Sequence, residues 1–186
     1  MAIASVAGLS LCLLAGLLFI VPPITAVLTA YLFLTMALIT LTDLRHFIIP
    51  DVLSLPAIPV GLLASAIIQP DGEWLRGLTS GLAGAAAGGG TFYLLRAAYM
   101  RFRGIEGLGL GDVKLAAVAG AWLGPAALAP ACLVATMSAI AAIILHAAFK
   151  GGSKIDPHRH VPFGSFIAPT ILGFWFLRIV DGMPIW

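Results

Sequence analysis

The run ITAVLTAYLFLTMALITLT at residues 24–42 decides the fold, because it contains no charged residue and ends directly at Asp43. A helix needs about 20 mostly apolar residues to cross the hydrocarbon core of a bilayer. The run is close to that length. It therefore predicts a transmembrane helix with an acid at its end.

The rest of the 186-residue chain has the same character, with 61% hydrophobic and 10% charged residues. Soluble domains have about half apolar and about a quarter charged residues. In lipid, backbone polar groups must be satisfied internally, and the near absence of strand-like alternation favours helices over a barrel. We therefore predict an all-α, polytopic transmembrane helical bundle forming one domain over residues 1–186. Its seven or so spans are expected at 3–20, which we interpret as a retained helix, 24–42, 52–68, 74–99, 112–123, 126–149 and 162–180.

The basic residues alternate between the expected loops. Those after the second, fourth and sixth spans are basic, and they or their flanks contain Arg45, His46, Arg96, Arg101, Arg103, Lys114, Lys150, Lys154 and Arg159. The other loops are poor in bases, and Arg178 near the C-terminus is the main exception. The positive-inside rule then places the basic loops and the N-terminus in the cytoplasm and the C-terminus outside.

Several alternative classes lack support. No basic stripe with interleaved aromatics indicates nucleic-acid binding. Cys12 and Cys132 lie in apolar runs without CxxC spacing, so we expect them to pack as small hydrophobes. Glycines with small-xxx-small spacing in residues 77–90 predict close helix packing within one bundle in preference to a dimer interface. The four tryptophans, notably Trp74 and Trp186, are expected to be interfacial anchors.

Two acids lie at the edges of apolar runs. Asp43 ends the second span and Asp112 begins the fifth, and the predicted topology puts both at the cytoplasmic face. Two close carboxyls share a proton, so one can activate water while the other protonates a peptide carbonyl. The alternatives are an ordinary helix cap for Asp112 and an interfacial acid paired with Arg45 or His46 for Asp43.

Glycines precede Asp112 at every second position. Gly107, Gly109 and Gly111 lack a Cβ, so the backbone there is free to take positive φ and a substrate strand can approach it closely. At a helix N-terminus, Asp112 would also be favoured in its ionised form by the helix dipole.

Three segments together resemble the prepilin peptidases, also called type IV leader peptidases. Residues 106–115, EGLGLGDVKL, contain a GxGD motif and resemble the second catalytic segment of that family. Residues 43–51, DLRHFIIPD, resemble the first, and residues 161–166, VPFGSF, resemble a late Pro-Phe-Gly element. This chain has Ser165 where a second proline is common in the family.

The resemblance implies a membrane aspartyl endopeptidase that uses Asp43 and Asp112, with no metal or cofactor. Its substrates would be type IV prepilins or the pseudopilins of type II secretion, cut at the cytoplasmic face of the bacterial inner membrane. The expected partners are these substrates and membrane lipid, with no nucleic acid. The formation of a homo-oligomer is left as an open alternative. Long family members also methylate the new N-terminus and have a zinc-binding insert with paired CxxC motifs. This chain resembles the short, peptidase-only form, so N-methyltransferase activity is not expected.

Other residues have supporting or alternative interpretations. Glu106 lies near Asp112, and Lys114 is expected either to tune Asp112 or to contact lipid phosphate. Pro162 is expected to begin the last helix, with Phe163 and Gly164 bordering the substrate groove by resemblance. We expect Asp51 to cap the helix after Pro50. Asp156, His158 and His160 are interpreted as a solvated loop rather than a metal site.

A rival hypothesis keeps the same two acids but removes the enzyme. A membrane transporter or a pilus or secretion assembly factor would use Asp43 and Asp112 to bind ions or protons. Leader cleavage that depends on both aspartates would distinguish the two hypotheses.

Overall fold

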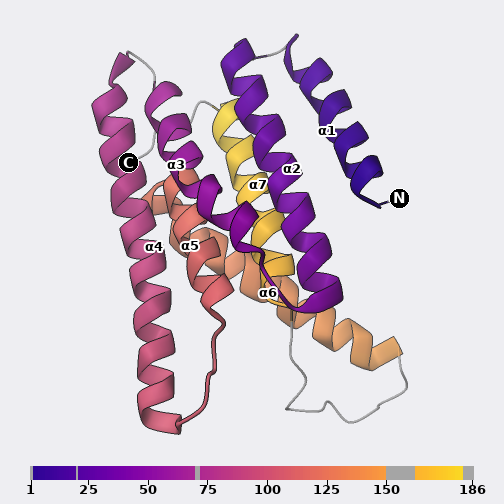
Figure 1. Cartoon of the computed structure of the whole chain (residues 1–186), viewed down its shortest axis with the longest axis vertical. Helices are drawn as coiled ribbons and strands as arrows, with labels where there is room; N and C mark the ends of the chain where they lie inside the picture. The colour runs from indigo at the N-terminus through magenta and orange to yellow at the C-terminus, as the bar shows by residue number, and fades with distance from the viewer. Residues whose placement is uncertain (1, 20, 70–71, 150–161, 182–186) are drawn as a thin grey trace.

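The computed structural model describes residues 2–19, 21–69, 72–149 and 162–181. Within these ranges the chain is all-α, as predicted, and it contains no β-strand (Figure 1). Its seven helices are α1 (Ala2–Leu17), α2 (Pro23–His46), α3 (Asp51–Ile67), α4 (Trp74–Arg103), α5 (Leu110–Leu123), α6 (Pro125–Phe149) and α7 (Gly164–Asp181). Each predicted apolar run corresponds to one of them.

Two helices are longer than predicted at their C-terminal ends. α2 includes Arg45 and His46, and α4 includes Arg101 and Arg103, all of which we expected in loops. Basic side chains are favourable in the last turn of a helix because they face the negative end of its dipole. Asp43 therefore lies within the last turn of α2 and not at its final residue.

Two helices in the described part of the chain are long and apolar enough to cross a bilayer, over Pro23–His46 and Pro125–His146. Shorter apolar helices occur at Ser5–Leu17, Asp51–Ile67 and Gly164–Ile179. The number of spans and the cytoplasmic N-terminus stay predictions.

The helices that contain the two aspartates share two neighbours. α2 packs against α1, α3 and α7, whereas α5 packs against α3, α4, α6 and α7 (Figure 1). α5 is buried on most of its surface, from Leu115 to Leu123. A helix that is apolar on all its faces belongs in the centre of a bundle, which explains why these residues of the 14-residue α5 are buried.

Glycines let α4 approach α3 and α5 closely. A methyl group on Gly84 would clash with the backbone of Gly120, and one on Gly88 would clash with the Ala116 carbonyl. Gly77 lies equally close to the Ser65 carbonyl of α3. The predicted close packing within one bundle is confirmed.

A tryptophan pair fills the half of the bundle away from Asp112. The Trp122 and Trp175 rings meet edge to face with centroids 4.9 Å apart, and both side chains are fully buried. Their ring nitrogens donate to the Ala57 carbonyl at 2.8 Å and to Thr29 Oγ1 at 2.9 Å. Interfacial anchoring was therefore the wrong prediction for these two, because their N–H groups find partners inside the bundle. Trp74 is exposed, and Trp186 lies outside the described residues.

Arg178 belongs to the same cluster. It is buried, it donates to the Trp122 carbonyl at 2.5 Å, and its guanidinium lies 5.3 Å from the Trp175 ring centroid. The arginine thus binds a carbonyl at the C-terminal end of α5, where cations are favourable. This role explains why Arg178 departs from the pattern of basic loops.

Candidate functional site

Asp43 is buried in the last turn of α2, and its partner is the first turn of α7. The Ser165 backbone N–H donates to Asp43 Oδ2 at 2.6 Å, and the Ser165 hydroxyl donates to the same oxygen at 2.8 Å. The charged alternatives expected for Asp43, Arg45 and His46, are exposed at the end of α2. The carboxylate is therefore held by α7 and not by a basic neighbour.

Helix dipoles explain this arrangement. Asp43 lies near the C-terminus of α2, where the dipole disfavours negative charge, but it faces the N-terminus of α7, where negative charge is favoured. A buried carboxylate also needs donors to offset its lost hydration. The start of α7 supplies both the dipole and the donors.

Asp112 is the third residue of α5 and is half-buried. The capping position belongs to Gly109, and no side chain caps the helix, so the cap interpretation of Asp112 was wrong. The Asp112 carboxyl forms a hydrogen bond with the backbone of Gly109 and is close enough to Asp43 for the two to repel each other. The structure thus brings the two aspartates, far apart in sequence, to one end of the bundle.

Ile49 fills the space between the segments that hold the two acids. A methyl group on Gly111 would lie 2.9 Å from Ile49 Cβ, and one on Gly164 would lie 2.7 Å from Ile49 Cδ1 and 3.0 Å from Asp43 Oδ2. Ile49 itself is buried. Contacts therefore run from Asp43 through Gly164 and Ile49 to Gly111, the residue before Asp112.

The glycines before Asp112 allow close packing but not left-handed backbone. Gly107 lies directly against the Tyr99 ring, as Gly111 does against Ile49. Positive φ in the described glycines occurs at Gly72, Gly104 and Gly124, so our expectation of it before Asp112 was wrong. Gly109 is extended with φ −70°, a conformation that other residues also adopt.

Lys114 engages Asp51. Its Nζ lies 2.5 Å from Asp51 Oδ1, which joins the first turn of α5 to the first residue of α3. Asp51 was expected to cap α3, but Pro50 occupies the capping position and no side-chain cap bond forms. The ion partner of Lys114 is therefore Asp51 and not Asp112, and its contact with lipid phosphate stays a prediction.

Glu106 anchors the loop before α5. Its carboxylate lies 2.6 Å from an Arg96 nitrogen, and Arg96 Nε also donates to the Leu108 carbonyl at 3.4 Å. Arg96 is on α4, so the pair fixes the glycine-rich loop to that helix. Glu106 therefore supports the site from outside it.

The Pro-Phe-Gly segment leads into α7. The helix begins at Gly164 and not at Pro162 as expected, and the Pro162 carbonyl accepts from the Ser165 N–H at 3.1 Å. Phe163 packs against the core, and Gly164 is buried beside Asp43. Of the three, Gly164 is the one placed against a candidate catalytic group.

Ser165 is the residue that sequence reasoning missed. It was noted only as a departure from the usual proline, although that departure adds an N–H and a hydroxyl. Its partner is 122 positions away in sequence. No local pattern connects the two residues, so the sequence carried no signal for this contact.

The described ranges contain no group of three or more His, Cys, Asp or Glu side chains suited to a metal ion. The cluster of Asp156, His158 and His160 lies outside them. Cys12 and Cys132 are unpaired thiols.

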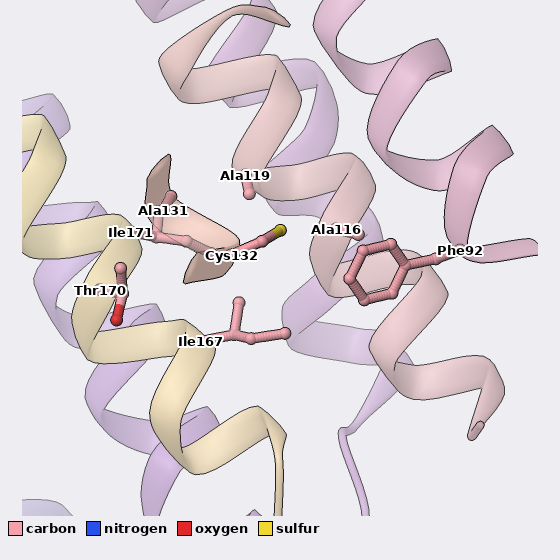
Figure 2. A pocket seen from close by; sticks show the side chains of 8 residues that line it. All are labelled: Phe92, Ala116, Ala119, Ala131, Cys132, Ile167, Thr170 and Ile171. Carbon is pink, nitrogen blue, oxygen red and sulfur yellow. The ribbon is translucent and has the colours of Figure 1, made fainter. Parts of the chain in front are cut away.

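Two apolar hollows occur away from the carboxyl groups. Figure 2 shows a cavity of about 10 Å³ between α4, α5, α6 and α7, lined by Phe92, Ala116, Ala119, Ala131, Cys132, Ile167, Thr170 and Ile171. That volume is near the minimum for one water molecule. A more open groove of about 310 Å³ lies between α1, α2 and α7, one turn from Asp43, and it includes Thr40 and Leu41.

The fold and the site together define a class: an all-α bundle of membrane-protein composition with two carboxyl groups at one end. Comparison with known proteins gives the family. Residues 30–149 match the type IV leader peptidase family, and the chain belongs to that family. The match ends before α7, so it does not include Ser165.

Curated relatives agree with this assignment. The chain is 34% identical over 131 residues to the leader peptidase HopD of Escherichia coli, covering 70% of this chain and 80% of the relative. It is 38% identical over 154 residues to a prepilin leader peptidase/N-methyltransferase of Neisseria gonorrhoeae, covering 82% and 49%. A protein of that same name from Xanthomonas campestris is 34% identical over 144 residues, covering 75% and 47%. The chain thus spans about half the length of several curated relatives, and no solved structure matches it.

Proposed function

We propose that the protein is a membrane aspartyl endopeptidase that removes the leader peptides of type IV prepilins or pseudopilins. The observation that carries the proposal is the meeting of Asp43 and Asp112 at one end of the bundle. Family membership supports the peptidase activity and the substrate class. The site would lie at the cytoplasmic face of the bacterial inner membrane, in a multi-pass protein with its N-terminus inside.

The proposed reaction needs only the two carboxyl groups and water. The ionised aspartate takes a proton from water as the water oxygen attacks the peptide carbonyl, and the protonated aspartate donates to the carbonyl oxygen. As the tetrahedral intermediate collapses, the C–N bond breaks and the leaving amine takes the proton that the base gained from water. One hydroxyl of the intermediate returns its proton to the other aspartate as the new carboxyl group forms, so the pair ends with the single proton with which it began. Two nearby carboxyl groups resist double ionisation, so the pair begins with the one proton that the reaction requires.

Leader cleavage in a bacterial host tests the proposal. Co-expression with a type IV prepilin should yield a shortened pilin, detected by gel shift and located by sequencing the new N-terminus. Asp43→Asn and Asp112→Asn should each abolish cleavage, because either change removes one proton-transfer group at nearly constant shape. The matched control is Asp51→Asn, which neutralises the nearby acid held by Lys114 and should leave cleavage in place.

The same experiment addresses the rival function. If the protein binds ions without cleaving peptides, wild type will leave the prepilin at full length. Cleavage that survives in both aspartate variants would show that the catalytic assignment is wrong. Mass spectrometry of the processed pilin also tests N-methylation, for which we expect an unmodified N-terminus.

A further inference from the structure

We infer that Ser165 is a positioning residue that holds Asp43 as the carboxylate, so that Asp43 acts as the base and Asp112 as the acid. The inference rests on the proposed peptidase function and goes beyond it by assigning the two roles. Ser165 itself does not touch the reacting atoms. It acts through Asp43 Oδ2, to which both of its donors bind at 2.6 and 2.8 Å.

The two donors differ in what they demand of Asp43. A backbone N–H can only donate, so it favours a negatively charged oxygen at Oδ2. The hydroxyl donates equally well but can also accept. Because the N–H cannot adapt, the pair of contacts is better satisfied by the carboxylate than by the protonated acid.

The hydroxyl also has an alternative partner. Ser165 Oγ lies 3.5 Å from the Thr40 carbonyl, so its O–H can donate to that oxygen when Oγ accepts a hydrogen bond from protonated Asp43. The shorter 2.8 Å contact to Asp43 favours the arrangement in which the carboxyl is ionised. Both donors bind Oδ2, so Ser165 leaves the other oxygen, Oδ1, unengaged and available to take a proton from water.

Asp112 is placed for the opposite role. It is half-buried, so its loss of hydration opposes ionisation first and the charge of Asp43 second, while a hydrogen bond from the Gly109 backbone acts in the opposite direction. Two carboxyl groups in one site take different protonation states when their surroundings differ. Asp43 accepts from two Ser165 donors, whereas the donor to Asp112 is the Gly109 backbone, so we place the shared proton on Asp112.

Other charged groups near Asp43 do not offer the same control. On α2, Arg45 and His46 are exposed. Three helices pack against α2. α1 contains no charged residue, α3 contributes Asp51, which is paired with Lys114, and α7 contributes Arg178 and Asp181 at its far end. That far end lies about 20 Å from Ser165, because 13 or more helical residues separate the two. Ser165 and Asp112 therefore dominate the environment of Asp43.

The test is the pH dependence of cleavage by the purified full chain in detergent micelles, with a type IV prepilin as substrate. Ser165→Ala removes the hydroxyl but keeps the N–H. We expect kcat to fall about tenfold at neutral pH, and the acidic limb of the kcat/KM profile to move up by about one pH unit, because the base now holds its proton to higher pH. Ser165→Thr keeps a hydroxyl and should restore the profile.

Thr170→Val is the matched control. It removes a hydroxyl from the same helix, where Thr170 Oγ1 donates to the Phe166 carbonyl at 2.8 Å. Its pH profile should stay that of wild type. A merely structural effect of Ser165→Ala would lower activity without moving the acidic limb, and that result would overturn the inference.

An infrared titration gives a readout that does not depend on cleavage. The carboxyl band that disappears in Asp43→Asn should shift its midpoint upward in Ser165→Ala. An unmoved band would overturn the positioning role even if the variant were inactive. If wild type cleaves no prepilin, the proposed function fails instead, so the two failures are distinguishable.

Discussion

At the scale of single residues, Asp43 places a carboxyl group near the C-terminus of α2, where the helix dipole disfavours negative charge. Asp43 lies in the last turn of α2, whose carbonyl groups form the negative end of the helix dipole. The start of α7 compensates with the Ser165 donors. This placement makes the acid dependent on the exact position of α7, and Gly164 decides how closely α7 can approach.

Gly164→Ala should therefore impair cleavage while the bundle still folds. The added methyl group would lie 3.0 Å from Asp43 Oδ2 and 2.7 Å from Ile49 Cδ1, so the carboxylate must shift away from Ser165. Weakening one hydrogen bond to a charged group costs about 1.5–3 kcal/mol, which corresponds to a fall in kcat of about tenfold or more. A prepilin cleavage assay measures the fall, and thermal unfolding in detergent checks the fold.

Gly173→Ala is the control on the same helix. Nothing lies within 4 Å of a methyl group at that position, so activity should be unchanged. Equal activity of the two alanine variants would show that Asp43 does not depend on the approach of Gly164.

The sequence predicts which residues matter better than it predicts their partners. Asp43 and Asp112 stand out because a charge at the edge of an apolar run needs a reason. Ser165 and Ile49 gave no such signal, since serine and isoleucine are ordinary at helix starts and in loops. The Lys114–Asp51 pair was missed for a related reason: its members are far apart in sequence, and each had a simpler local interpretation.

At the scale of helices, the apolar runs in the sequence predict where the helices lie but not the residues at which they end. α2 and α4 continue through their basic residues, and each stops at a residue whose backbone is in the left-handed conformation. These residues are Phe47 with φ 54° and Gly104 with φ 71°. A glycine at that position is a familiar stop signal, but a phenylalanine is not. The span predicted at 112–123 corresponds to α5, which is buried among four other helices.

The contact between α4 and α5 should be intolerant of even one methyl group. We expect Gly84→Ala to lower the free energy of unfolding by about 1–3 kcal/mol, because the methyl group would meet the backbone of Gly120 and Gly124, which cannot rotate away. Reversible unfolding in mixed micelles measures the change.

Gly90→Ala on the same helix is the comparison. A methyl group there meets nothing within 4 Å, so the better helix propensity of alanine should leave stability equal or raise it by up to about 1 kcal/mol. If Gly84→Ala were as stable as Gly90→Ala, the two helices would not be in backbone contact.

At the scale of the whole molecule, many large hydrophobic side chains lie on the outer surface. Large hydrophobic side chains are exposed on all seven helices, including Leu9 and Leu11 on α1, Leu94 and Leu95 on α4, and Leu133, Ile144 and Leu145 on α6. Soluble monomers rarely expose apolar patches on this scale. The surface therefore fits a lipid environment, with the polar contacts turned inward to Trp122, Trp175 and Asp43.

The orientation of α4 decides on which side of the membrane the aspartates lie. Its 30 residues span about 45 Å, more than the hydrocarbon core of a bilayer, so its two ends should emerge on opposite sides.

Labelling of single cysteines with a membrane-impermeant maleimide tests this orientation, in a background with Cys12→Ala and Cys132→Ala. Glu73→Cys, just before α4, should react in intact spheroplasts. Phe102→Cys, exposed in the last turn of α4, should react only after the membrane is opened. The reverse pattern would place Asp43 and Asp112 at the outer face and contradict cleavage in the cytoplasm, because the C-terminal end of α4 leads through a short loop to the start of α5, which contains Asp112.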